Sequence, residues 1–228
     1  MPHILFVHGA WHHGSGFDEL RTVLDARGIT SSTVELTSVA RDGEPIGDLY
    51  RDAALLREAV AALDGDCVVL AHSYGGVVTT QALAGLTNVS RIIYLTAFVL
   101  DEGESLFAAC GSMDPPWWIR SADGERLTAG TPTDIFYNDC APQVAARASA
   151  ALRTQSIASF MQPVTEVAWR HIPSTYVLCT NDQAIPLFAQ ERMSARCGEV
   201  LSITSDHSPF LSHVEELGEL VASVVTRA

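Results

Sequence analysis

The feature that most constrains the fold is a serine placed between a buried strand and a helix. Residues 67–72 are apolar on both faces, as a strand covered by helices on both sides requires, and a helix is expected over residues 75–86. Ser73 lies between them, with the small residues Ala71 and Gly75 two positions to either side. A sharp strand-to-helix turn crowds the backbone and exposes the serine oxygen above the sheet. The segment therefore predicts an α/β fold in which Ser73 is a nucleophile.

Short apolar runs alternate with longer amphipathic runs along most of the chain. The expected strands are residues 3–8, 32–36, 67–72, 91–97, 173–180 and 200–204, and the expected helices are residues 16–27, 49–63, 75–86, 186–196 and 212–226. This alternation predicts a mostly parallel six-stranded sheet with right-handed crossovers and helices on both faces. With 228 residues, 47% of them hydrophobic and 18% charged, the chain can bury the core of one globular domain.

The alternation is interrupted in the middle of the chain by a stretch with two adjacent prolines, two adjacent tryptophans and an Asp-Gly turn. Residues 119–121 and 126–128 flank that turn and predict a small hairpin. The stretch has too few strand-helix units to extend the sheet. We therefore expect residues 1–98 and 171–228 to form the core, and residues 99–170 to fold over one edge of the sheet as a cap.

Two polar residues are expected at the same edge of the sheet as Ser73. His207 comes just after the sixth expected strand, and Asp182 comes just after the fifth. An imidazole at that edge can take the serine proton and return it to a leaving group, while a carboxylate fixes the tautomer of the imidazole. Asp101, which follows the fourth expected strand, is the alternative acid.

A glycine-rich loop at residues 8–14 follows the first strand and reaches the same edge. We expect the main-chain N–H groups of Ala10 and Tyr74 to donate to a developing oxyanion, each contributing roughly 3 kcal/mol. His12 and His13 do not predict a metal site, because adjacent histidines project in different directions and no carboxylate is nearby. Several aromatic residues are expected to line an apolar substrate site: Trp11, Trp117, Trp118, Phe136, Phe160, Phe188 and Phe210.

Composition excludes several kinds of chemistry and partner. All fourteen basic residues are arginine, so no lysine is present for a Schiff base or a phosphate loop. A net charge of −13 disfavours nucleic acids and anionic membranes. Five scattered cysteines form no CxxC pair, and no apolar run reaches the roughly 18 residues of a membrane span. Because the N-terminus also lacks a basic leader, we expect a cytoplasmic protein. None of these motifs indicates a cofactor, and we expect none. Its partner would be a small-molecule substrate, and the sequence leaves a homodimer open.

These motifs together resemble the α/β-hydrolase superfamily, and in particular its small branch of plant methylesterases, hydroxynitrile lyases and bacterial esterases. The resemblance is carried by residues 8–11, 72–76 and 206–207, by Asn181-Asp182 ahead of Pro186, and by the chain order Ser, Asp, His. It implies a sheet in which the six expected strands lie in the order second, first, third, fourth, fifth, sixth. It also implies hydrolysis of a carboxylic ester or thioester through an acyl-enzyme, with a small apolar or aromatic substrate.

Two alternatives follow from the same resemblance. The hydroxynitrile lyases imply a lysine beside the histidine, but Ser208 occupies that position and the chain has no lysine. A ligand receptor of the same fold can retain the three catalytic side chains without turning over a substrate. Release of nitrophenol from a short-chain nitrophenyl ester would distinguish an esterase from such a receptor.

Overall fold

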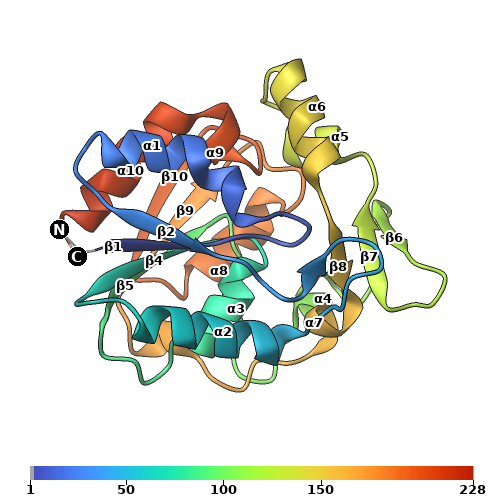
Figure 1. The fold of residues 1–228 in the computed structure, drawn as a ribbon, viewed down its shortest axis with the longest axis horizontal. Helices are drawn as coiled ribbons and strands as arrows, with labels where there is room; N and C mark the ends of the chain where they lie inside the picture. The colour runs from blue at the N-terminus through green and yellow to red at the C-terminus, as the bar shows by residue number, and fades with distance from the viewer. Residues whose placement is uncertain (1–2, 228) are drawn as a thin grey trace.

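The computed structural model describes residues 3–227, which form a six-stranded parallel sheet with helices on both faces (Figure 1). Its strands lie in the order β2-β1-β4-β5-β9-β10, and every neighbouring pair is parallel. Their bounds are β1 His3–Val7, β2 Ser31–Val34, β4 Cys67–His72, β5 Val89–Leu95, β9 Ser174–Cys179 and β10 Glu199–Ile203. Both the fold class and the strand order expected from the sequence are confirmed.

Helices cover the two faces of the sheet in two groups, as Figure 1 shows. One face carries α1 (Asp18–Asp25), α9 (Pro209–Ser212) and α10 (Val214–Val225), preceded by the 3₁₀ turn η1 (Gly14–Phe17). The other face carries α2 (Leu49–Ala61), α3 (Gly75–Ala82) and α8 (Leu187–Ser194). The expected helix over residues 212–226 thus begins two residues later, at Val214.

The core consists of two apolar clusters, one on each side of the sheet. In β1, Ile4 and Phe6 belong to the cluster under α1 and α10, whereas Leu5 and Val7 belong to the cluster under α2 and α3. Successive strand residues point to opposite faces, so a strand that is apolar at every position fills both clusters.

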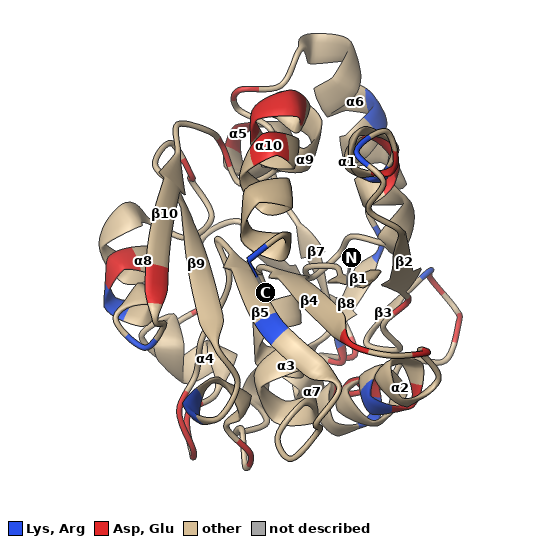
Figure 2. Cartoon of the chain, turned by 90° about the vertical axis from the view of Figure 1, so that its left-hand side faces the viewer, with Lys and Arg blue, Asp and Glu red and all other residues tan. Residues whose placement is uncertain are grey.

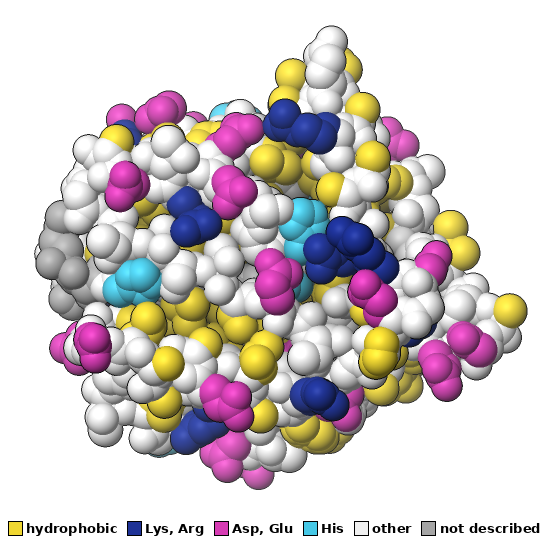
Figure 3. Space-filling view, in the orientation of Figure 1, with side chains coloured by type: hydrophobic (Ala, Val, Ile, Leu, Met, Phe, Trp, Pro, Cys, Tyr) yellow, Lys and Arg dark blue, Asp and Glu magenta, His cyan; other side chains and the backbone are white. Residues whose placement is uncertain are grey.

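Acidic residues lie on the outer helices α1, α2, α8 and α10 (Figure 2). Side chains of both signs are interspersed with apolar ones on the face shown in Figure 3.

A second, antiparallel sheet lies beside the core at the end where the parallel strands finish (Figure 1). Its order is β3-β8-β7-β6, with bounds β3 Val39–Ala40, β6 Trp118–Arg120, β7 Arg126–Ala129 and β8 Thr154–Ser156. Short helices complete this region: α4 Leu106–Ala109, α5 Pro132–Phe136, α6 Pro142–Ala151, α7 Ile157–Met161 and η2 Ala168–Arg170.

The expected hairpin is present as β6 and β7, but the sequence did not indicate β8 or β3. Because β3 comes from residues 39–40, the cap sheet also uses a strand from outside residues 99–170. The division of the chain into core and cap at those boundaries stays a prediction. No helix within residues 3–227 combines the length and the hydropathy needed to cross a bilayer.

Candidate active site

Ser73 occupies the turn between β4 and α3 and has a φ of 53°, a left-handed conformation that costs energy in a residue with a Cβ. Two glycines make this turn possible. A Cβ at Gly75 would lie 2.6 Å from the carbonyl oxygen of Val7, and one at Gly76 would lie 2.4 Å from that of Phe98. Helix α3 can therefore begin directly against the backbone at the ends of β1 and β5.

His207 follows β10, and its Nδ1 donates a hydrogen bond of 2.7 Å to Oδ2 of Asp182, which follows β9. Both residues are buried. The other carboxylate oxygen accepts from the main-chain N–H groups of Ala184, at 2.7 Å, and Ile185, at 2.9 Å. These two donors hold the Asp182 carboxylate in place. With its proton on Nδ1, the ring leaves Nε2 free to accept a proton.

Thr96 is a site residue that the sequence analysis missed. It directly follows β5 and has a φ of 34°, and its hydroxyl donates to the same Asp182 oxygen that accepts from His207. The sequence could have indicated Thr96, because it is a hydroxyl residue at the end of an apolar strand, at the edge of the sheet where the other site residues lie. Asp101, the alternative acid, instead forms an ion pair of 2.5 Å with Arg170. The structure thus joins Asp182, and not Asp101, to His207.

Ser73 and His207 line the same cavity, which has a volume of about 30 Å³. That space is on the scale of one or two water molecules. Among residues 3–227, no hydrogen bond joins the Ser73 hydroxyl to the His207 ring. Contacts of this kind are often long in an enzyme without substrate and tighten in the complex. Ser73 and His207 would therefore have to approach each other before a proton could pass between them.

Aromatic side chains make up much of the wall of this cavity. Five of the expected aromatics line it: Trp11, Trp117, Trp118, Phe136 and Phe160. Phe210 does not, since its ring packs 4.8 Å from Phe17 and 4.9 Å from His72 in the cluster on the opposite side of the sheet. Phe188 is 74% exposed on α8. These two placements correct the expectation that Phe210 and Phe188 face the substrate.

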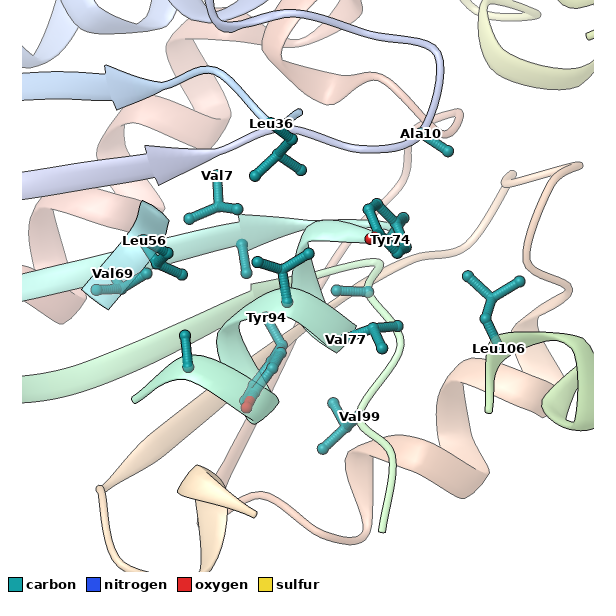
Figure 4. Close-up of a cluster of buried hydrophobic side chains, with 14 of the residues drawn as sticks. Val7, Ala10, Leu36, Leu56, Val69, Tyr74, Val77, Tyr94, Val99 and Leu106 are labelled. Carbon is teal, nitrogen blue, oxygen red and sulfur yellow. The ribbon is translucent and has the colours of Figure 1, made fainter. Parts of the chain in front are cut away.

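Ala10 and Tyr74 lie towards the same end of the apolar cluster in Figure 4, and both line the cavity. Ala10 lies in a turn closed by a 3.3 Å hydrogen bond from the His12 N–H to the Gly9 carbonyl. The main-chain N–H groups of Ala10 and Tyr74 donate to no other residue in the described range 3–227. Both donors are thus unoccupied beside the serine, as an oxyanion site requires.

Two buried histidines support this arrangement as neutral side chains. His12 donates from Nδ1 to the Ala10 carbonyl, at 2.7 Å, and accepts at Nε2 from the Tyr137 hydroxyl, at 3.0 Å. Burial lowers the pKa of His12 to about 3. His72 donates from Nε2 to the carbonyl of His207, at 2.8 Å, and burial lowers its pKa well below 6.5. Both rings stay uncharged at neutral pH and fix the backbone of site residues.

Other hollows and clusters lie away from Ser73. A larger surface groove of about 840 Å³ is lined in part by His13, Glu35 and Arg153, but neither Ser73 nor His207 contributes to it. In the part of the chain that the structure describes, no three His, Cys, Asp or Glu side chains are grouped so that they could hold a metal ion. We therefore place the candidate chemistry at the small aromatic cavity and not in the larger groove.

Known proteins resemble this chain over almost its whole length. Residues 4–220 match the profile described as "Alpha/beta hydrolase family". The chain is 27% identical to the alpha/beta hydrolase nvfD of Aspergillus novofumigatus, over 100% of this chain and 98% of that protein. It is 25% identical to the pyrethroid hydrolase of Sphingobium wenxiniae, over 96% of this chain and 86% of that protein. The crystal structure of the methylesterase MES16 from Arabidopsis aligns over 100% of both chains with a TM-score of 0.81 and 23% identity.

Proposed function

Because this chain belongs to the alpha/beta hydrolase family, we propose that it hydrolyses carboxylic esters or thioesters of small apolar or aromatic compounds through an acyl-enzyme on Ser73. One observation carries the proposal: the hydrogen-bonded pair of Asp182 and His207 opens onto the cavity that holds Ser73. The names of the relatives, among them a pyrethroid hydrolase and a carbendazim-hydrolysing esterase, support the same reaction class.

The first half of the reaction forms the acyl-enzyme. Nε2 of His207 accepts the hydroxyl proton while the oxygen of Ser73 bonds to the ester carbonyl carbon. The carbonyl oxygen becomes an oxyanion and accepts from the N–H groups of Ala10 and Tyr74. When the tetrahedral intermediate collapses, the bond to the alcohol or thiol breaks, and that group leaves with the proton from His207. Asp182 stabilises the imidazolium that exists between the two proton transfers.

The second half releases the acid. A water molecule gives a proton to His207 and attacks the acyl carbon, which again places negative charge on the oxygen held by the two N–H groups. Collapse then breaks the bond to Ser73, which recovers its proton from His207. Both halves pass through an oxyanion, and removing one donor from such a site costs roughly 3 to 4 kcal/mol of transition-state stabilisation.

The residues of the cavity wall favour an uncharged, apolar substrate. Among the described residues 3–227, no Asp, Glu or Arg lines it, and most of its lining residues are apolar or aromatic. A charged substrate would lose its hydration there without gaining a partner of opposite charge. Because the volume is only about 30 Å³, the aromatic side chains of the wall must move apart to admit an ester.

The proposal is tested with p-nitrophenyl butyrate and a fluorophosphonate. The wild-type protein should release p-nitrophenol with a burst, and mass spectrometry should locate one phosphonyl group on Ser73. Ser73→Ala should reduce kcat by roughly 10⁶, while Ser202→Ala, a change at an exposed position on β10, should leave kcat unchanged. Folded wild-type protein without turnover would favour a receptor, and a label on another residue would reject Ser73 as the nucleophile.

A further inference from the structure

Trp11, the residue after the proposed oxyanion donor Ala10, is bound to the cap at three points. Its main-chain N–H donates to Oε1 of Gln155, at 3.4 Å, and its indole Nε1 donates to the carbonyl of Leu127, at 3.0 Å. Its own carbonyl accepts from the N–H of Arg153, at 2.9 Å. The φ of Trp11 is 63°, so the turn that presents Ala10 is strained and depends on these contacts to persist.

Gln155 also connects to the second oxyanion segment. Its Nε2 donates to the hydroxyls of Ser38, at 3.0 Å, and Ser159, at 2.7 Å. The Ser38 hydroxyl in turn lies 3.5 Å from the hydroxyl of Tyr74. All four side chains are completely buried. A continuous line of polar groups therefore runs from the Trp11 N–H through Gln155 and Ser38 to the side chain of Tyr74.

The line ends at a buried carboxylate. Asp52, in the first turn of α2, accepts from the Tyr74 hydroxyl, at 2.9 Å, from the Thr37 hydroxyl, at 2.8 Å, and from the Ser38 N–H, at 3.0 Å. Burial raises the pKa of Asp52, while these three donors favour its charged form. A carboxylate held by three donors near a helix N-terminus gives the network a fixed end.

We infer that Gln155 is a positioning residue for the oxyanion hole, and that it sets the spacing between the N–H groups of Ala10 and Tyr74. The two donors come from different segments, the loop after β1 and the turn after β4. Gln155 binds the first through Trp11 and the second through Ser38. Because Gln155, Ser38, Ser159 and Tyr74 are all buried and paired, removing the amide of Gln155 leaves several groups unsatisfied and allows the two segments to shift. This inference rests on the proposed function, since only a reaction through an oxyanion requires that spacing.

The test replaces Gln155 with leucine, which has a similar volume but no polar group. Gln162→Leu is the matched control. Gln162 also joins the cap to the core, accepting from the Leu49 N–H at 2.9 Å and donating to Asp48 at 3.1 Å, but it contacts neither oxyanion segment. For each variant, kcat and KM are measured with p-nitrophenyl butyrate, and active sites are counted from the end point of fluorophosphonate labelling. The inhibition constant of an aryl trifluoromethyl ketone, which forms an oxyanion on the serine, is measured in parallel.

Gln155→Leu should lower kcat per labelled site by about 10- to 100-fold and change KM by less than about threefold, because a misplaced donor weakens both tetrahedral states and not ground-state binding. The inhibition constant should rise by the same factor as kcat falls, and Gln162→Leu should change neither quantity. A purely structural role would reduce the number of labelled sites while each remaining site kept its wild-type kcat, and that result would overturn the inference.

Two further results would distinguish a failure of the Gln155 inference from a failure of the proposed function. If Gln155→Leu does not fold, Ser38→Ala removes the next link of the network and must give the same pattern of lowered kcat and raised inhibition constant. If the wild-type protein shows neither a burst nor labelling of Ser73, the proposed function itself is wrong. A normal wild-type burst with an unchanged Gln155→Leu variant would refute the role of Gln155 alone.

Discussion

Acidification from pH 7 to pH 5 should destabilise this protein through His12. The ring is buried, and burial disfavours its charged form, which lowers the pKa of His12. Its pKa is about 3 in the folded protein and about 6.5 in an unfolded chain. Between those two values the unfolded state binds a proton that the folded state does not, so stability falls as the pH falls below about 6.5.

The size of the effect follows from the same two pKa values. At pH 5 the unfolded histidine lies about 1.5 units below its pKa, and each unit corresponds to about 1.4 kcal/mol, which gives a loss of about 2 kcal/mol from this residue. The loss would continue towards pH 3. Asp52 acts in the opposite direction, because its raised pKa makes the folded state bind a proton more readily than the unfolded state. His72, whose pKa burial also lowers well below 6.5, adds a loss of the same sign, so a variant of His12 alone is needed to isolate the contribution of His12.

The assay is urea unfolding followed by tryptophan fluorescence at pH 7 and pH 5. Between the two pH values, wild-type protein should lose about 2 kcal/mol more unfolding free energy than His12→Gln, which has no imidazole to protonate. Tyr137→Phe is the control: it removes a hydrogen bond worth about 1 kcal/mol and keeps the imidazole, so it should retain the pH dependence of the wild type. Equal losses in His12→Gln and wild type would refute the reasoning.

Two other substitutions and one chemical modification test the site further. Asp182→Asn should lower kcat by about 10⁴ in the nitrophenyl ester assay, because an amide at this position favours the wrong imidazole tautomer; a loss below about tenfold would speak against its role. Gly76→Ala should lower the free energy of unfolding in urea by about 1–3 kcal/mol, since its Cβ would lie 2.4 Å from the Phe98 carbonyl oxygen; an unchanged midpoint would show that the turn adapts. Iodoacetamide at pH 7 should leave activity intact although Cys110 lines the cavity, because burial raises its pKa to about 11 and only roughly one thiol in 10⁴ is ionised; rapid inactivation would contradict this.

The three residues of the proposed triad could be placed from the sequence because parallel strands share one carboxyl edge. Ser73, Asp182 and His207 each follow a short apolar run that has the length and composition of a buried strand. Once the runs are assigned to one parallel sheet, the residues just after them must lie at the same edge. Thr96 follows β5 in the same way, so the rule could have identified it as well.

Residues whose position depends on the face of the sheet could not be placed in this manner. Phe210 lies three residues after His207, but it is in the short helix α9 and its ring packs in the cluster on the opposite side of the sheet from the cavity. Proximity in sequence to a catalytic residue says nothing about which side of the sheet a side chain reaches. The strands β3 and β8 have only two and three residues, too few to show an alternating pattern, and their pairing joins segments more than a hundred residues apart.

The buried network around Gln155 has one signal in the sequence, which is an acidic residue on the apolar face of a helix. Asp52 lies three residues after Leu49 and four before Leu56, on the stripe of α2 that is otherwise apolar and buried. A carboxylate on such a stripe must either break the helix packing or find several donors in the core, because an unpaired buried charge is costly. The sequence therefore predicts that buried hydrogen-bond donors lie near Asp52, but it does not indicate which residues supply them. Its donors are Thr37, Ser38 and Tyr74, and Tyr74 is the residue after Ser73, the proposed nucleophile. Asp52 is therefore one end of the network that we propose positions the oxyanion donors.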